Sequence, residues 1–172
     1  YGIDIDMLDQ QNPHGGMQNI DRIRATHEVE PNLQLLHTIF PLVHRALRER
    51  GFFILFCDIM NWQFLYDRAI EVGFKVQRWP FIWHKSHQCM NQSAQFNFTK
   101  NFEIAMVCRK PGATIITPQN SSVFECGSEG YISNPFAKPF FLWEQLIKAV
   151  TIQGQVILDP FAGEGSAVKT FI

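Results

Sequence analysis

Apolar and polar positions along the chain follow two periods, one typical of amphipathic helices and one typical of short strands. Apolar residues recur three and four positions apart over residues 33–50, which predicts a helix, and Pro41 within it predicts a kink or a break. Helical spacing over residues 61–72, closed by Gly73, predicts a second helix. A third helix is expected over residues 138–150.

Short apolar runs separate these helices. They predict strands at residues 51–57, 74–83, 102–108, 114–117, 123–126 and 155–158. The first run is continuous and is expected to be covered on both faces, the last is expected to be buried, and Pro80 is expected to place a bulge or an edge within the second. Helices that alternate with apolar strands predict an α/β sandwich with a largely parallel sheet.

The composition is that of one globular domain, with 172 residues of which 46% are hydrophobic and 18% charged. No apolar run is long enough to cross a bilayer, so no membrane association is expected. Polar stretches at residues 6–30 and 84–101 are predicted to be mobile loops. The chain begins with Tyr1 and stops within an expected helix, so residues 1–172 are interpreted as a single incomplete domain of a longer protein. The four widely spaced cysteines are typical of reduced thiols in a cytosolic protein.

Charge is distributed unevenly, although the net charge is only −1. Residues 75–110 contain six lysine and arginine residues and one carboxylate, Glu103. This surplus fits either a solvated basic surface or a surface that contacts phosphates. The candidate nucleic-acid contacts in this stretch are Trp83, Lys85, His87 and Lys100.

The same stretch holds a small group of candidate metal ligands, His84, His87 and Cys89. A zinc site needs a fourth ligand and usually contains paired cysteines, and the sequence offers no such pair. No metal is therefore expected, and a loop that faces nucleic acid is the preferred interpretation.

The most specific local pattern is Val-Ile-Leu-Asp-Pro-Phe-Ala-Gly-Glu-Gly-Ser at residues 156–166, where an apolar run enters a Gly-x-Gly turn and a helix is expected to begin. Glycines let the backbone adopt dihedral angles forbidden to other residues and approach a ligand closely. The first amides of the following helix favour a carboxylate or a phosphate. A dinucleotide-binding loop would have a third glycine where this chain has Val168, so a dehydrogenase is disfavoured.

The string Asp-Pro-Phe-Ala-Gly-x-Gly-Ser resembles the cofactor motif of amino-methyltransferases that act on DNA. By this resemblance the expected cofactor is S-adenosylmethionine, and the expected binding residues are Asp159, Pro160, Phe161, Ala162, Gly163, Gly165 and Ser166. Upstream, Asn-Pro-Phe-Ala-Lys-Pro at residues 134–139 resembles the family's His-Pro-x-x-Lys-Pro element, with Asn134 in place of the histidine. The resemblance adds Lys138 to the cofactor-binding set, as a cation for the cofactor carboxylate.

Three further segments resemble the same family. Tyr-Gly-Ile-Asp at residues 1–4 resembles the tail of its catalytic Asp-Pro-Pro-Tyr motif, residues 81–85 its strand ending in Trp-x-Lys, and residues 101–103 its later Asn/His-x-Glu. A catalytic motif that precedes the cofactor motif is the permuted, β-class order. The resemblance therefore implies a Rossmann-like class I methyltransferase three-layer sandwich, with a mostly parallel sheet and an antiparallel edge hairpin.

The activity that the resemblance implies is transfer of a methyl group from S-adenosylmethionine to the exocyclic amine of a base flipped out of double-stranded DNA. Tyr1 is the expected catalytic residue, stacked on the base, and residues 6–30 are expected to close over base and cofactor. Adenine N6 is the expected target, with cytosine N4 as the close variant and a degenerate, nucleic-acid-binding methyltransferase fold as the other alternative. A homodimer or a partner subunit stays open, and a cytoplasmic protein of bacterial or phage origin is expected.

Overall fold

The computed structural model describes residues 33–86, 95–96, 98–118, 121–127, 137–163 and 165–169. In chain order these residues form α3 (Leu33–Ala46), β1 (Phe52–Cys57), the 3-10 turn η1 (Ile59–Asn61), α4 (Trp62–Glu71), β2 (Lys75–Val76), β3 (Phe81–Lys85), β4 (Phe102–Arg109), β5 (Val123–Cys126), α5 (Phe140–Val150) and α6 (Ser166–Lys169). None of the described helices is both long and apolar enough to span a membrane.

The five strands form one sheet in the order β1-β4-β3-β5, with β2 also paired to β4. β4 runs antiparallel to β1, β2 and β3, whereas β5 runs parallel to β3. The expected mostly parallel sheet is therefore wrong for the described strands. Among the described residues no helix lies between β3 and β4, so the chain returns beside β3 in the opposite direction instead of crossing over the sheet. Because β4 alone is reversed, β1, β3 and β5 end toward one side, which we call the carboxyl edge.

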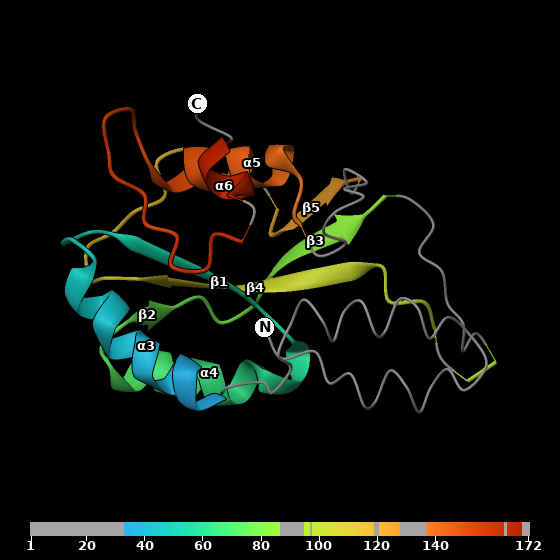
Figure 1. The fold of residues 1–172 in the computed structure, drawn as a ribbon, viewed down its shortest axis with the longest axis horizontal. Helices are drawn as coiled ribbons and strands as arrows, with labels where there is room; N and C mark the ends of the chain where they lie inside the picture. Colours follow the sequence, from blue (N-terminus) through green and yellow to red (C-terminus); the bar gives the residue numbers. More distant parts are fainter. Residues whose placement is uncertain are drawn as a thin grey trace.

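Helices cover both faces of this sheet, with α3 and α4 on one side and α5 and α6 on the other (Figure 1). Successive residues of a strand point to opposite faces. In β1, Leu55 and Cys57 belong to the core beneath α3 and α4, whereas Ile54 and Phe56 pack against the core that contains Leu142 of α5. The α/β class and the three layers predicted from the sequence are thus confirmed.

The three predicted helices are present as α3, α4 and α5. α3 passes through Pro41 without a break and ends at Ala46, before the predicted end at residue 50. The proline ring is exposed, whereas Leu36 and Phe40 on the same helix are 4% and 0% exposed. Burial of these two side chains stabilises the helix although Pro41 has no backbone N–H to donate.

Two predicted strands are absent. At residues 114–117, the backbone N–H groups of Ile116 and Thr117 donate to the carbonyl of Ala149 at the end of α5, at 2.8 and 3.3 Å. At residues 155–158, expected to be a buried strand, Val156 and Leu158 are instead 95% and 71% exposed. An apolar run becomes a strand only where a neighbour supplies hydrogen bonds, and none of the described strands pairs with this run.

The interruption predicted at Pro80 is confirmed, because it separates β2 from β3. β3 continues through Lys85, so His84 and Lys85 belong to a strand and not to the predicted loop at residues 84–101. Residues 87–94 and 97 of that loop, and the whole loop predicted at residues 6–30, lie outside the described residues.

Candidate active site

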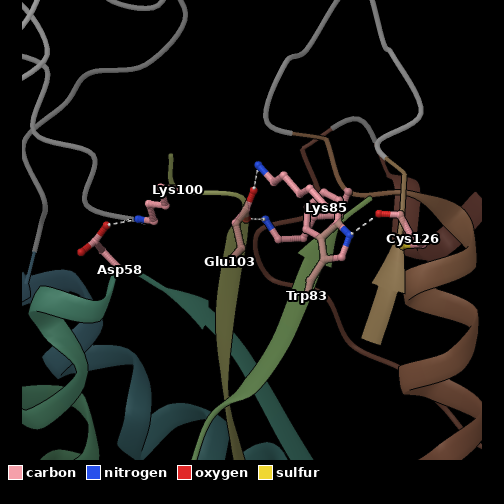
Figure 2. Close-up of polar contacts among 7 residues, drawn as sticks. Asp58, Trp83, Lys85, Lys100, Glu103 and Cys126 are labelled. Carbon is pink, nitrogen blue, oxygen red and sulfur yellow. Dashed lines mark hydrogen bonds and ion pairs between the residues drawn. The ribbon is translucent and has the colours of Figure 1, made fainter. Parts of the chain in front are cut away.

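Charged side chains gather at the carboxyl edge, where the strand ends bring them together. Asp58 follows β1, Lys85 ends β3, and Glu103 lies near the start of the reversed strand β4. Lys138, two residues before α5, reaches the same edge. Figure 2 shows that Glu103, Lys85 and the Asp58–Lys100 pair lie at this end of the sheet.

Glu103 is the centre of a three-residue ion-pair cluster. Its Oε1 lies 2.9 Å from Nζ of Lys85, and its Oε2 lies 3.1 Å from Nζ of Lys138. Burial opposes ionisation of the Glu103 carboxyl, but the ammonium groups of Lys138 and Lys85 outweigh burial and hold its pKa below the ordinary value. The carboxylate is therefore ionised at neutral pH, and the cluster has a net charge of about +1.

Aromatic rings also hold the two ammonium groups. Nζ of Lys85 lies 5.0 Å from the centroid of the Trp83 ring, and Nζ of Lys138 lies 4.6 Å from that of Phe56. Cation–π contacts of this length are attractive. Each lysine is thus fixed by a carboxylate oxygen on one side and a ring on the other.

Trp83 itself is a core residue, which corrects its prediction as a nucleic-acid contact. Its side chain is 2% exposed and packs with Leu142 and Leu146 of α5. Its indole N–H donates to the carbonyl oxygen of Cys126 on the neighbouring strand at 3.1 Å (Figure 2). A ring in this position stabilises the join between β3, β5 and α5 and leaves no face for a base.

Lys100 is the most accessible of the predicted nucleic-acid contacts within the described residues, with 58% of its side chain exposed. Its Nζ lies 3.3 Å from Oδ2 of Asp58, whose Oδ1 accepts the backbone N–H of Met60 at 2.9 Å. Burial opposes ionisation of Asp58, but the Met60 N–H and Lys100 outweigh it and lower its pKa. Asp58 therefore joins the end of β1 to the segment that enters β4.

This pair predicts a pH dependence of stability. A carboxyl whose pKa is lower in the folded chain stabilises it above the unfolded pKa, and that contribution is lost as the pH falls through the folded pKa. The free energy of unfolding of the wild type should therefore exceed that of Asp58→Asn at pH 7, by no more than about 1 kcal/mol because the pair is partly exposed. The difference should shrink as the pH falls below about 4 in urea titrations. A difference that grows on acidification would contradict the assignment.

Both ring nitrogens of His84 have protein partners. Its Nε2 accepts from the amide of Asn101 at 2.8 Å, so its Nδ1 is the nitrogen that donates to Glu125, at 3.2 Å. Within the described ranges no group of three His, Cys, Asp or Glu side chains could hold a metal ion. His87, a predicted nucleic-acid contact, and Cys89 lie outside those ranges.

The cysteines of the described core are thiols, as predicted from their spacing. Burial raises the pKa of Cys57 to about 11 and that of Cys108 to about 12. A thiol with such a pKa has almost no thiolate at neutral pH, so neither residue can serve as a nucleophile.

The glycine turn at residues 159–166 is held by short local hydrogen bonds. Oδ1 of Asp159 accepts the backbone N–H of Phe161 at 3.0 Å, and the N–H of Gly165 donates to the carbonyl of Ala162 at 2.7 Å. Gly163 and Gly165 have φ values of +54° and +76°, which side-chain-bearing residues rarely adopt. A Cβ added at Gly165 would meet no atom within 4 Å, so open space lies beside the turn.

Trp143 of α5 joins this turn to the Lys138 segment. Its indole N–H donates to Oγ of Ser166 at 3.3 Å, and its ring meets the ring of Phe56 edge-on at 5.6 Å between centroids. Phe56 in turn lies beneath the ammonium group of Lys138. The two elements that the sequence assigned to one ligand are therefore connected through α5 and β1.

The open space beside Gly165, and the ammonium group of Lys138 linked to the turn through Trp143 and Phe56, fit a ligand that has a carboxylate. The structure places Lys138, Ser166 and residues 159–163 and 165 among the described residues, whereas the predicted catalytic residue Tyr1 lies outside them. The sequence did not predict the connecting roles of Phe56, Trp143 and Glu103. Glu103 alone of the three gave a signal, as the single carboxylate in a cationic stretch and as the last residue of the Asn-x-Glu segment that resembles the family.

A sequence profile of the DNA methylase family matches residues 5–171. The chain therefore belongs to that family. A comparison with curated protein sequences gives no match.

Several solved structures are similar to this chain in fold. The M1.HpyAVI-SAM complex has a TM-score of 0.69 at 23% identity, over 82% of this chain and 72% of that one. M1.HpyAVI has a TM-score of 0.64 at 22% identity, over 82% and 70% of the two chains. TTHA0409 of Thermus thermophilus, described as a DNA modification methylase, has a TM-score of 0.59 at 20% identity, over 80% and 66%.

Proposed function

We propose that this chain binds S-adenosylmethionine through residues 159–163, Gly165, Ser166 and Lys138. It transfers the methyl group of this donor to the exocyclic amine of a base extruded from double-stranded DNA, and adenine N6 is the preferred target. The observation that supports this most is the turn with left-handed Gly163 and Gly165 and open space beside Gly165, linked to Lys138 through Trp143 and Phe56. Membership of the DNA methylase family supports the substrate class.

The donor, when bound, supplies a methyl group attached to a positively charged sulfur. Lys138 offers its ammonium group to the donor's carboxylate, and its contacts with Glu103 and Phe56 keep that group in place. Gly163 and Gly165 carry no side chain, so the donor could approach the backbone closely at these two positions. The N–CH3 bond would form as the S–CH3 bond breaks, the donor would leave as a neutral thioether, and the methylated amine would release one proton to solvent. No metal is required, and alignment of the two reactants does much of the work.

The acceptor needs more help, because the lone pair of a base amine is delocalised into the ring. Extrusion from the duplex exposes the amine, and a stacked aromatic ring holds the base. Tyr1 is the proposed ring, and such stacking contributes roughly 1–3 kcal/mol per base. Lys85, Lys100 and His87 are the proposed contacts to the phosphate backbone, whereas the buried Trp83 is not.

The product of the reaction tests this proposal. We expect the chain, incubated with duplex DNA and methyl-labelled S-adenosylmethionine, to release labelled N6-methyladenine after digestion of the DNA to nucleosides. Labelled N4-methylcytosine would support the proposed methyl transfer but would identify cytosine as the target base. Cofactor binding without any labelled base would favour a degenerate subunit, and absence of both cofactor binding and label would refute the proposal.

A further inference from the structure

Glu103 uses its two oxygens separately, one for each lysine. Oε1 pairs with Nζ of Lys85 from β3 at 2.9 Å, and Oε2 pairs with Nζ of Lys138 from the segment before α5 at 3.1 Å. The three side chains are largely withdrawn from solvent, with exposed fractions of 24% for Lys85, 31% for Glu103 and 17% for Lys138. Figure 2 shows the carboxylate of Glu103 between two ammonium groups.

This arrangement differs from an ordinary surface ion pair, in which two long side chains move in solvent and contribute little. Here each ammonium group also lies over a ring, Trp83 for Lys85 and Phe56 for Lys138. Trp83 and Phe56 both pack around the core of α5, so the rings themselves are fixed. Without the carboxylate, the aliphatic chain of Lys138 could turn its charge elsewhere.

The charge of the cluster matters as much as its geometry. One carboxylate and two ammonium groups leave a surplus of about one positive charge, which stays available to an anion. Glu103 therefore does not cancel the charge of Lys138. It fixes where that charge lies.

We infer that Glu103 is a positioning residue: it holds the ammonium group of Lys138 where the donor's carboxylate binds, and it ties that group to Lys85 of the surface proposed to face DNA. The inference rests on the proposed function, because it assumes that Lys138 meets the donor. It adds a residue to the cofactor site that contacts neither reactant and acts through Lys138.

Substitution Glu103→Gln tests this with a small change of shape. A glutamine has one acceptor oxygen and one NH2 group, so it can accept from only one of the two lysines. We expect the Kd and the KM for S-adenosylmethionine to rise about tenfold, as for loss of a charged hydrogen bond, with kcat changed less than about twofold. Glu103→Asp keeps two oxygens and should recover part of the affinity.

A double-mutant cycle separates positioning from general disturbance. Lys138→Gln should weaken donor binding about tenfold, and Glu103→Gln should add little in the Lys138→Gln background if it acts through that lysine. Glu125→Gln is the matched control, because Glu125 is a carboxylate at the same edge that pairs with His84, and it should bind the donor as the wild type does. All variants are compared by calorimetric titration after their unfolding curves show that they are folded.

The outcomes distinguish the two claims. Additive losses from Glu103→Gln and Lys138→Gln would overturn the positioning role. Tighter binding by Glu103→Gln would overturn it as well, because it would mean that the carboxylate competes with the donor for Lys138. Absence of donor binding by the wild type would refute the proposed function itself.

Discussion

Replacement of Gly165 by alanine is expected to weaken S-adenosylmethionine binding at least about 100-fold while leaving the chain folded. Gly165 has a φ of +76°, and a Cβ there would meet no protein atom within 4 Å. The cost to the free chain is therefore confined to backbone strain of about 1–2 kcal/mol. The loss of affinity comes from a methyl group that projects into the open space where we propose that the donor lies.

Gly154 provides a matched control for this substitution. It has a φ of +87°, and an added Cβ would also meet nothing within 4 Å, but it lies outside the glycine turn. Gly154→Ala should show similar strain in thermal unfolding and bind the donor as the wild type does. Equal affinities for Gly165→Ala and Gly154→Ala, measured by calorimetry, would show that the space beside Gly165 is not the donor site.

The second large effect is expected from Trp83→Ala, and it concerns stability. Trp83 of β3 is 2% exposed, packs against α5, and donates its indole N–H to the carbonyl oxygen of Cys126. Truncation of a buried aromatic side chain lowers the free energy of unfolding by about 3–5 kcal/mol. The carbonyl of Cys126, left without its hydrogen-bond donor, adds to this loss. Urea unfolding should show a reduction of this size in the free energy of unfolding.

Trp79→Ala is the control for Trp83→Ala. Trp79 is 58% exposed, so its truncation should change the free energy of unfolding by less than about 0.5 kcal/mol. If Trp83→Ala unfolded like the wild type but lost DNA affinity, Trp83 would be a contact residue and its burial in the fold would not explain its role.

Elements whose patterns are self-sufficient could be predicted from the sequence. β1 is a continuous apolar run and α5 has an apolar stripe at helical spacing, and both lie where the pattern placed them. The prediction of a strand at residues 155–158 was wrong, because a strand depends on a hydrogen-bonding partner that a local sequence pattern does not reveal. The direction of β4 was equally hidden, since it depends on how the chain returns from β3.

The candidate site divides in the same way. The glycine turn and Lys138 could be found because residue type and order specify them. Trp83 was misjudged because alternation along β3 turns its ring toward α5, while Lys85, two residues later on the same face, reaches the edge. Glu103 could be recognised as a shared partner only when β3, β4 and the segment before α5 came together.

A crystal structure of the chain with S-adenosylmethionine would show where the donor binds. We expect the donor to lie against the turn around Gly163 and Gly165, with its carboxylate in contact with Lys138 while Lys138 keeps its ion pair with Glu103. A donor bound elsewhere on the chain, or one whose carboxylate makes no contact with Lys138, would contradict this expectation.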